Sequence, residues 1–255
     1  MQKFYKYQGT GNDFVMIDNR DGSFEASQQR VGSLCDRRFG IGADGLILIE
    51  NAEGFDFKMV YFNADGNEGS MCGNGGRCAV KFASDLNIFD NETLFIAVDG
   101  PHQASIENGL IHLRMMDVNG VEVTPEYDFL NTGSPHYIQF VEDVRNFNVK
   151  EEGSRIRYAE EWVKRGGTNV NFVEPVDDGL IVRTYERGVE DETFSCGTGV
   201  TAAALDAHVK YGHSSPVSIT TLGGSLKVSF KPTGIHSFSD IFLIGPAEKV
   251  FEGEI

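Results

Sequence analysis

The sequence predicts an α/β (α+β) protein with two similar domains, and two observations carry this prediction. Strand-like and helix-like segments alternate along the 255 residues, as expected for a mixed chain. The tetrad Cys-Gly-x-Gly also occurs twice, at residues 72–75 and 196–199, each time directly before a helix-like segment. Because the same motif recurs in the same local setting, the chain is a candidate for internal duplication.

A shift of 124 positions, the one that superposes the two tetrads, aligns further landmarks without a gap. It places segment 9–12 on 133–136, Tyr61 on Tyr185, and the turn at 99–100 on that at 223–224. Each match is weak alone, because glycine and alanine coincide often by chance. Their common order indicates that one half of the chain repeats the other.

Each half is expected to contain the same series of elements. Early strands are predicted at 14–17 and 137–141, and alternating apolar residues predict strands at 55–61 and 180–184. A helix is expected over 27–38, and two more over 74–86 and 198–208. The pairs Asn108-Gly109 and Gly223-Gly224 predict β-hairpins. We therefore expect many strands around one central helix in each domain.

Composition and charge exclude several classes of function. With 40% hydrophobic and 24% charged residues, the chain is typical of soluble globular proteins. No apolar run approaches the ~20 residues that a membrane span needs, and the N-terminus lacks the apolar core of a signal peptide. We expect a cytoplasmic protein without a membrane partner. The formal net charge of -16 also argues against nucleic acid, which requires a basic surface.

The four cysteines divide into two kinds. Structural disulfides are rare in the cytoplasm, and the spacing offers no Cys-x-x-Cys or Cys-x-x-His pair for a metal site. Cys35 and Cys78 fall on apolar stretches of expected helices and are interpreted as core thiols. Cys72 and Cys196 are the candidate functional thiols.

Because each tetrad stands at the start of an expected helix, it is a candidate site for binding an anion and for a reactive thiol. The first turn offers unpaired N–H groups and the positive end of the helix dipole, which bind a carboxylate or phosphate and lower the pKa of a cysteine there. A phosphate loop is excluded, because residues 73–77 do not end in Gly-Lys-Ser/Thr. A cysteine hydrolase with His136 as its base would leave one tetrad unused.

Two thiols beside a bound carboxylate instead suit two-base racemisation. One thiolate removes the proton α to the carboxylate, and the other thiol returns a proton to the opposite face. The reaction needs no pyridoxal phosphate if the convergent N–H groups stabilise the developing carbanion.

Longer motifs extend over nearly the whole chain. They include Cys-Gly-Asn-Gly at 72–75, Glu-Arg-Gly at 186–188 and Cys-Gly-Thr-Gly at 196–199, with further segments at 9–14, 40–45, 62–66, 133–136 and 223–226. In kind and order they resemble the diaminopimelate epimerase family. The resemblance implies two domains, each a strongly curved mixed or antiparallel sheet wrapped around a central helix, with the active site in the cleft between them.

The same resemblance implies a reaction. The family interconverts LL- and meso-diaminopimelate without a cofactor, an isomerisation in lysine and peptidoglycan biosynthesis. The expected partner is therefore this small-molecule substrate, and a homodimer is the assembly that the resemblance suggests. Residues 1–116, together with 247–255, are assigned to the first domain, and residues 117–246 to the second.

The resemblance also assigns roles to single residues. Cys72 and Cys196 match the two catalytic cysteines, and His136 and Glu186 match positions that tune the thiols. The backbone donors that hold the reacting carboxylate are matched by Gly73, Asn74, Gly197 and Thr198. The residues that bind the remaining amino and carboxylate groups of the substrate are matched by Asn12, Asn63, Asn169, Glu186 and Arg187. Ser134 and Gly45 depart from the commonest family pattern, and we assign them no substrate contact.

Two alternatives stay open at this point. A related thiol racemase acting on proline or hydroxyproline would leave Asn63, Asn169, Glu186 and Arg187 without a purpose. A redox sensor would instead join Cys72 and Cys196 in a regulatory disulfide. The sequence also leaves open which thiol rests as the thiolate.

Overall fold

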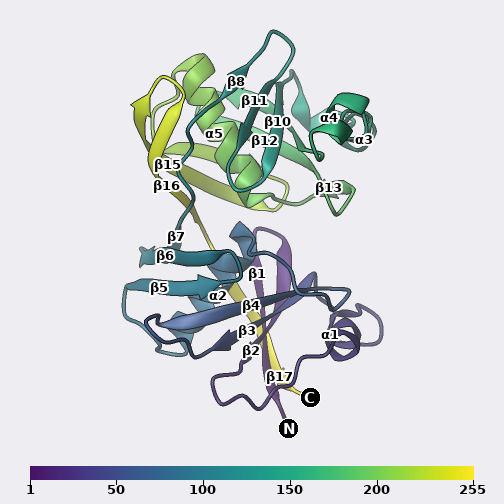
Figure 1. Cartoon of the computed structure of the whole chain (residues 1–255), viewed down its shortest axis with the longest axis vertical. Coiled ribbons are helices and arrows are strands. Elements are labelled where there is room, and N and C mark those ends of the chain that lie inside the picture. Colours follow the sequence, from purple (N-terminus) through teal and green to yellow (C-terminus); the bar gives the residue numbers. More distant parts are fainter. The chain divides into compact units, whose positions relative to one another are not determined.

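The computed structural model describes all 255 residues, from Met1 to Ile255. They form two compact units. Unit 1 comprises Met1–Leu113 with Gly245–Ile255, and unit 2 comprises Arg114–Ile244. Each unit combines one long helix with many strands (Figure 1). The predicted mixed α/β class is therefore confirmed. None of the helices has the length and apolar character needed to cross a membrane.

Unit 1 is a mixed sheet with two helices. Its strands pair in the order β17-β1-β2-β3-β4-β5-β6-β7, with β2–β3 and β4–β5 parallel and the other pairs antiparallel. The strands are β1 (Lys3–Gly9), β2 (Asn12–Asp18), β3 (Gly45–Glu50), β4 (Phe57–Asn63), β5 (Glu92–Ala97), β6 (Gly100–Glu107), β7 (Leu110–Arg114) and β17 (Glu248–Glu254). Helix α1 (Gln28–Cys35) makes one parallel connection and α2 (Gly73–Asp85) the other.

Unit 2 repeats this arrangement. Its strands pair in the order β8-β9-β10-β11-β12-β14-β15-β16, with β10–β11 and β12–β14 parallel. They are β8 (Glu122–Val123), β9 (Asp128–Asn131), β10 (Pro135–Phe140), β11 (Asn169–Val176), β12 (Gly179–Glu186), β14 (Val217–Thr221), β15 (Gly224–Gly234) and β16 (Ser237–Gly245), and the short β13 (Asp191–Thr193) also pairs with β12. The helical segments are η1 (Val144–Asn146), α3 (Val149–Arg157), α4 (Glu160–Lys164) and α5 (Gly197–Tyr211).

The long helices are the centres of the two units. Every residue of α2 from Gly73 to Val80 is buried, as is every residue of α5 from Gly199 to Ala207. A helix buried on all sides must be surrounded by other elements. Helix α2 packs against β1, β2, β3, β4 and β17, and α5 packs against β9, β10, β11, β12, β14 and β15. The expected sheet curved around a central helix is thus present in each unit.

Local sequence accounts for the turn between β6 and β7 and for the two ends of α1. Asn108 and Gly109 adopt φ values of 51° and 79°, the left-handed pair that a tight hairpin turn requires, and they join β6 to β7 as predicted. The helix expected over 27–38 is shorter. It begins after Ser27, whose side chain caps Arg30 N, and ends at Cys35. Asp36 Oδ1 accepts from the N–H groups of Arg38 and Phe39 at 2.7 Å, and this turn replaces the last helical residues.

Candidate active site

Cys72 occupies the start of α2. It is the N-cap residue, with extended backbone (φ -111°, ψ 151°), and its Sγ accepts a hydrogen bond from Gly75 N at 3.2 Å. A Cβ atom on residue 75 would lie only 3.1 Å from this sulfur, so glycine leaves room for the thiol. The side chain is partly exposed, and a reagent or substrate can reach it.

The side chains of two residues predicted to bind substrate, Asn12 and Asn74, are joined beside this helix start. Asn74 Nδ2 donates to Asn12 Oδ1 at 2.5 Å, and Asn12 Nδ2 donates to Asp44 Oδ2 at 2.9 Å. Asp44 is in turn bound by Arg37, which also holds Asp13. The sequence did not single out Asp44, although it lies within a motif segment. This chain of hydrogen bonds fixes the side chains of Asn12 and Asn74 beside the first turn of α2.

Asn63 lies apart from this chain of bonds. It is the exposed last residue of β4 and pairs in register with Gly45, the first residue of β3. A Cβ atom at Gly45 would lie 2.5 Å from both Phe62 O and Tyr61 Cε2. Glycine is therefore required here by the close approach of β4.

Cys196 is the equivalent N-cap residue of α5, with φ -114° and ψ 112°. Its Sγ lies 3.5 Å from Thr198 Oγ1, and the residue is 7% exposed. The structure thus places both candidate thiols at the same position of equivalent helices. Gly73 and Gly197 are the first residues of these helices, so their N–H groups belong to the unpaired first turns.

His136 is a fully buried, uncharged histidine on β10. Its Nδ1 lies 3.1 Å from Asn171 Nδ2, so Nδ1 is the acceptor and the proton resides on Nε2. Asn171 is fixed by donating to Tyr137 O and by accepting from Thr184 Oγ1. Burial lowers the pKa of His136 to about 3. Its Nε2 is a buried donor without a hydrogen-bond partner, which is rare in native proteins.

The remaining predicted residues of unit 2 meet around β11 and β12. Asn169 Nδ2 donates to Ser134 Oγ at 2.8 Å, and Asn169 Oδ1 accepts from Arg187 N at 2.9 Å. The Arg187 side chain is exposed and donates to Gly166 O at 3.0 Å. Glu186 Oε2 accepts from Thr193 Oγ1 at 2.9 Å. Ser134 therefore supports Asn169, a role that the sequence did not reveal.

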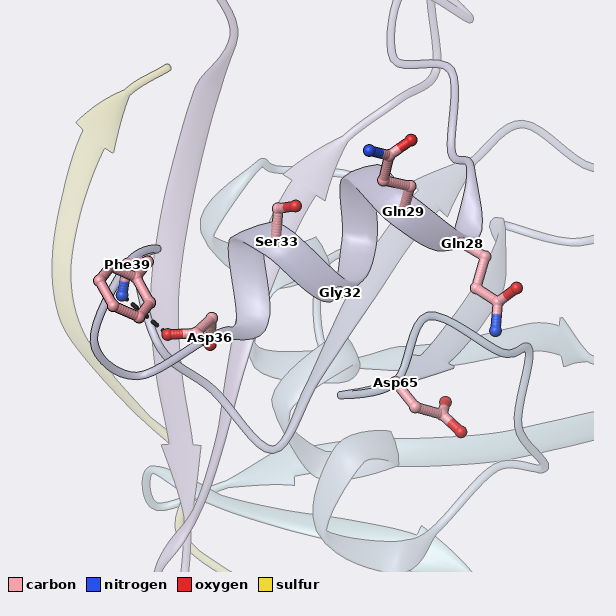
Figure 2. Close-up of a pocket in the computed structure, with 7 residues that line it drawn as sticks. All are labelled: Gln28, Gln29, Gly32, Ser33, Asp36, Phe39 and Asp65. Carbon is pink, nitrogen blue, oxygen red and sulfur yellow. Dashed lines mark hydrogen bonds between the residues drawn. The ribbon is translucent and has the colours of Figure 1, made fainter.

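A surface hollow of about 640 Å³ lies elsewhere, along α1 (Figure 2). It is lined by Gln28, Gln29, Gly32, Ser33, Asp36, Phe39 and Asp65. None of the predicted site residues belongs to it. Asp36 and Asp65 both accept backbone N–H groups, which lower the pKa of each carboxyl group, so neither is an acid–base group suited to neutral pH.

The narrow space at the start of α5 supports a test of the local structure. A Cβ atom on Gly199 would lie 2.5 Å from Asn171 Oδ1 and 3.3 Å from Cys196 Cβ. We expect Gly199→Ala to reduce the free energy of unfolding by about 1–3 kcal/mol, as overpacking does. Gly120→Ala is the matched control, because no atom lies within 4 Å of its Cβ position. Equal urea midpoints for the two variants would contradict the described packing.

The family follows from comparison with known proteins. The sequence model of one protein family, described as "Diaminopimelate epimerase", matches residues 4–115 and 129–250. The chain belongs to the diaminopimelate epimerase family. A diaminopimelate epimerase of Flavobacterium psychrophilum is 54% identical over 257 residues, covering 99% of this chain and 100% of that protein. The protein is therefore an enzyme of the isomerase class, an epimerase.

Solved structures share the fold at low sequence identity. A phenazine biosynthesis protein of the PhzF family from Bacillus anthracis gives a TM-score of 0.76 at 13% identity, covering 100% of this chain and 98% of that one. A hydroxyproline epimerase from Agrobacterium vitis gives 0.68 at 12% identity, covering 99% and 91%. These similarities concern the fold alone. They agree with the two-domain architecture expected from the sequence.

Proposed function

We propose that this protein interconverts LL- and meso-diaminopimelate, with Cys72 and Cys196 as the two groups that exchange protons with the α-carbon. Family membership and the 54% identity over the whole chain support the reaction and its place in lysine biosynthesis. One observation carries the assignment of the thiols. Cysteine is the N-cap residue of both central helices, α2 and α5.

The proton transfers balance without a cofactor. One thiolate takes the α-hydrogen as a proton and becomes a thiol, while the electrons of the broken C–H bond pass toward the substrate carboxylate. The second thiol gives its proton to the opposite face of the carbon and becomes a thiolate. The proposal requires that both sulfurs reach one bound α-carbon.

The helix starts supply the electrostatic stabilisation. We assign the reacting carboxylate to the backbone N–H groups of Gly73, Asn74, Gly197 and Thr198. Negative charge grows on this carboxylate as the proton leaves, and fixed donors lower the barrier because they need no reorganisation at that moment. His136 is uncharged and has an unused Nε2 donor, so we assign it to tuning the thiol of its unit, together with Glu186.

The rest of the substrate carries an ammonium and a second carboxylate. We assign these groups to Asn12, Asn63, Asn169, Glu186 and Arg187. The exposed guanidinium of Arg187 suits a carboxylate, and Asn169 holds the Arg187 backbone in place. We further propose that the enzyme works in the cytoplasm, where thiols stay reduced, and that it is a homodimer.

Arg187 provides a test of substrate choice. We expect Arg187→Ala to raise KM for diaminopimelate by about tenfold or more, because a charge-assisted hydrogen bond of about 1.5–3 kcal/mol is lost. Arg145→Ala is a suitable control, since Arg145 is another exposed arginine of unit 2. An unchanged KM would remove Arg187 from the binding site. Proline turnover that survives in the Arg187 variant would favour a proline racemase.

The reaction itself is tested in heavy water. Purified, fully reduced protein is incubated with LL-diaminopimelate without any added cofactor. We expect meso-diaminopimelate to appear with deuterium at the inverted α-carbon. Absence of α-deuteration would overturn the proposal. If in addition no other amino acid is turned over in reducing agent, a redox sensor would become the better interpretation.

A further inference from the structure

A buried positive charge lies at the start of α2, and the proposed mechanism does not use it. Arg77, in the second turn, is 0% exposed. Its guanidinium donates to Gly73 O at 3.2 Å, to Asn74 Oδ1 at 3.1 Å, to Thr10 Oγ1 at 2.9 Å and to Pro246 O at 3.3 Å. All four acceptors are uncharged, and no carboxylate contacts the guanidinium.

This placement is unfavourable unless an anion is close. Burying a cation without a counter-ion is costly, and the start of a helix adds positive potential. The carboxylates of this part of unit 1 are already paired, because Asp13 contacts Lys6 and Arg37, and Asp44 contacts Arg37. The anion that Arg77 needs must therefore come from another group.

Two thiols are the titratable neighbours of Arg77. One is Cys72, the N-cap residue directly before Gly73, whose carbonyl accepts from Arg77 Nη1, and the other is Cys78, the residue directly after Arg77. Complete burial raises the pKa of Cys78, so its thiol stays neutral at physiological pH. Cys72 is partly exposed and accepts the Gly75 N–H, an arrangement that favours the charged sulfur. Cys72 is thus the neighbour able to supply the negative charge.

Unit 2 lacks a cation at the corresponding place. The 124-residue shift puts Thr201 on Arg77, and Thr201 Oγ1 donates to Gly197 O at 2.9 Å, as Arg77 Nη1 does to Gly73 O. His136, also buried in this unit, is held neutral. The charged residues proposed for this half of the site are Glu186, tied to Thr193, and the exposed Arg187. The two helix starts are therefore equivalent in backbone and different in charge.

We propose that Arg77 is a positioning residue that holds Cys72 as the resting thiolate, so that Cys196 rests as the thiol in the substrate-free enzyme. This inference rests on the proposed function, because it describes the starting state of the two-thiol reaction. At the start of a turnover, the cysteine at the start of α2 is then the base and the cysteine at the start of α5 is the acid.

The resting charges can be measured without any turnover. The whole, substrate-free protein is treated with iodoacetamide across a pH series, and fragment masses locate the label on each cysteine. Because access differs between the sulfurs, the midpoints of the pH dependence are compared rather than the absolute rates. We expect the midpoint of Cys72 to lie about one pH unit or more below that of Cys196. Equal midpoints, or a lower one for Cys196, would overturn the inference.

Variants of Arg77 then test whether this residue causes the low alkylation midpoint of Cys72. Arg77→Met should raise the midpoint of Cys72 by about one unit, which slows its alkylation about tenfold on the acidic side, and should leave Cys196 unmoved. Arg77→Lys keeps the charge and should recover most of the shift. Thr201→Val is the matched control at the same position of α5 and should move neither midpoint.

The role of Arg77 and the proposed function can be tested separately, even if one variant does not fold. A folded Arg77→Met protein with an unchanged Cys72 midpoint would exclude the role of Arg77. If that variant does not fold, the unmodified protein and Arg77→Lys still decide the question. Absence of α-deuteration with the unmodified enzyme would instead refute the proposed function, whatever the alkylation midpoints show.

Discussion

Replacing either Cys72 or Cys196 by alanine should lower kcat for net inversion of diaminopimelate by about a thousandfold. Each face of the α-carbon needs its own acid–base group, and no other thiol is suited to replace the lost one. Cys78 is fully buried, and burial raises the pKa of Cys35 to about 11. The measurement is the appearance of the meso isomer from the LL isomer, followed by chiral chromatography.

The controls separate chemistry from folding. Cys35→Ala changes a buried thiol in the apolar cluster beneath α1 and should leave kcat unchanged. Cys72→Ser and Cys196→Ser keep a side chain able to cap the helix but not an acidic thiol, and they should be as inactive as the alanine variants. Full activity in one of the serine or alanine variants would mean that inversion needs only one of the two cysteines.

The central helices show how far the sequence can predict this fold. Helices were expected over 74–86 and 198–208, and they are α2 (Gly73–Asp85) and α5 (Gly197–Tyr211). The signals are local, since a Cys-Gly-x-Gly tetrad marks the start of each helix, and Ala202, Ala203 and Ala204 favour helix in α5. The end of α1 at Cys35 was missed, because it depends on Asp36 preferring a turn to a further helical turn. Side-chain hydrogen bonds of this kind compete with helix and are hard to anticipate.

In the candidate site, too, some residues can be predicted from local sequence and others only from the folded structure. Motifs were enough to select the two thiols and the residues Asn12 and Asn74, because each lies in a short, recognisable segment. Arg77 could not, since an arginine in a helix is usually exposed, and only the sheet curved around α2 buries it. The support of His136 by Asn171 also depends on the parallel pairing of β10 with β11. Partners that are distant in sequence become visible only in the assembled fold.

Asp206 should make unit 2 less stable as the pH rises toward 8. This carboxyl group is 0% exposed on α5, near Asp128, which is also buried and pairs with Lys210 at 2.6 Å. Burial, and then the negative charge of Asp128, raise the pKa of Asp206 from 3.8 to about 8. The folded protein therefore keeps a proton on Asp206 that the unfolded chain releases above its ordinary pKa.

The sign of the pH effect follows from this proton. The contribution of Asp206 to stability is complete below the unfolded pKa and is lost as the pH rises through the folded pKa, with a slope of up to about 1.4 kcal/mol per pH unit. Asp206→Asn keeps the shape and removes the titration. We expect the variant to gain stability relative to the unmodified protein between about pH 5 and about pH 8.

Trp162 allows the measurement to be made within unit 2. It is the one tryptophan of the chain and is 3% exposed, so its fluorescence reports unfolding of the unit that contains Asp206. Urea unfolding is followed at several pH values for the unmodified protein, for Asp206→Asn and for the exposed control Asp177→Asn. Taking the difference between each variant and the unmodified protein cancels the other titrating groups. Parallel curves for Asp206→Asn and the unmodified protein would mean that Asp206 is already ionised in the fold, and that Lys210 neutralises both buried carboxylates.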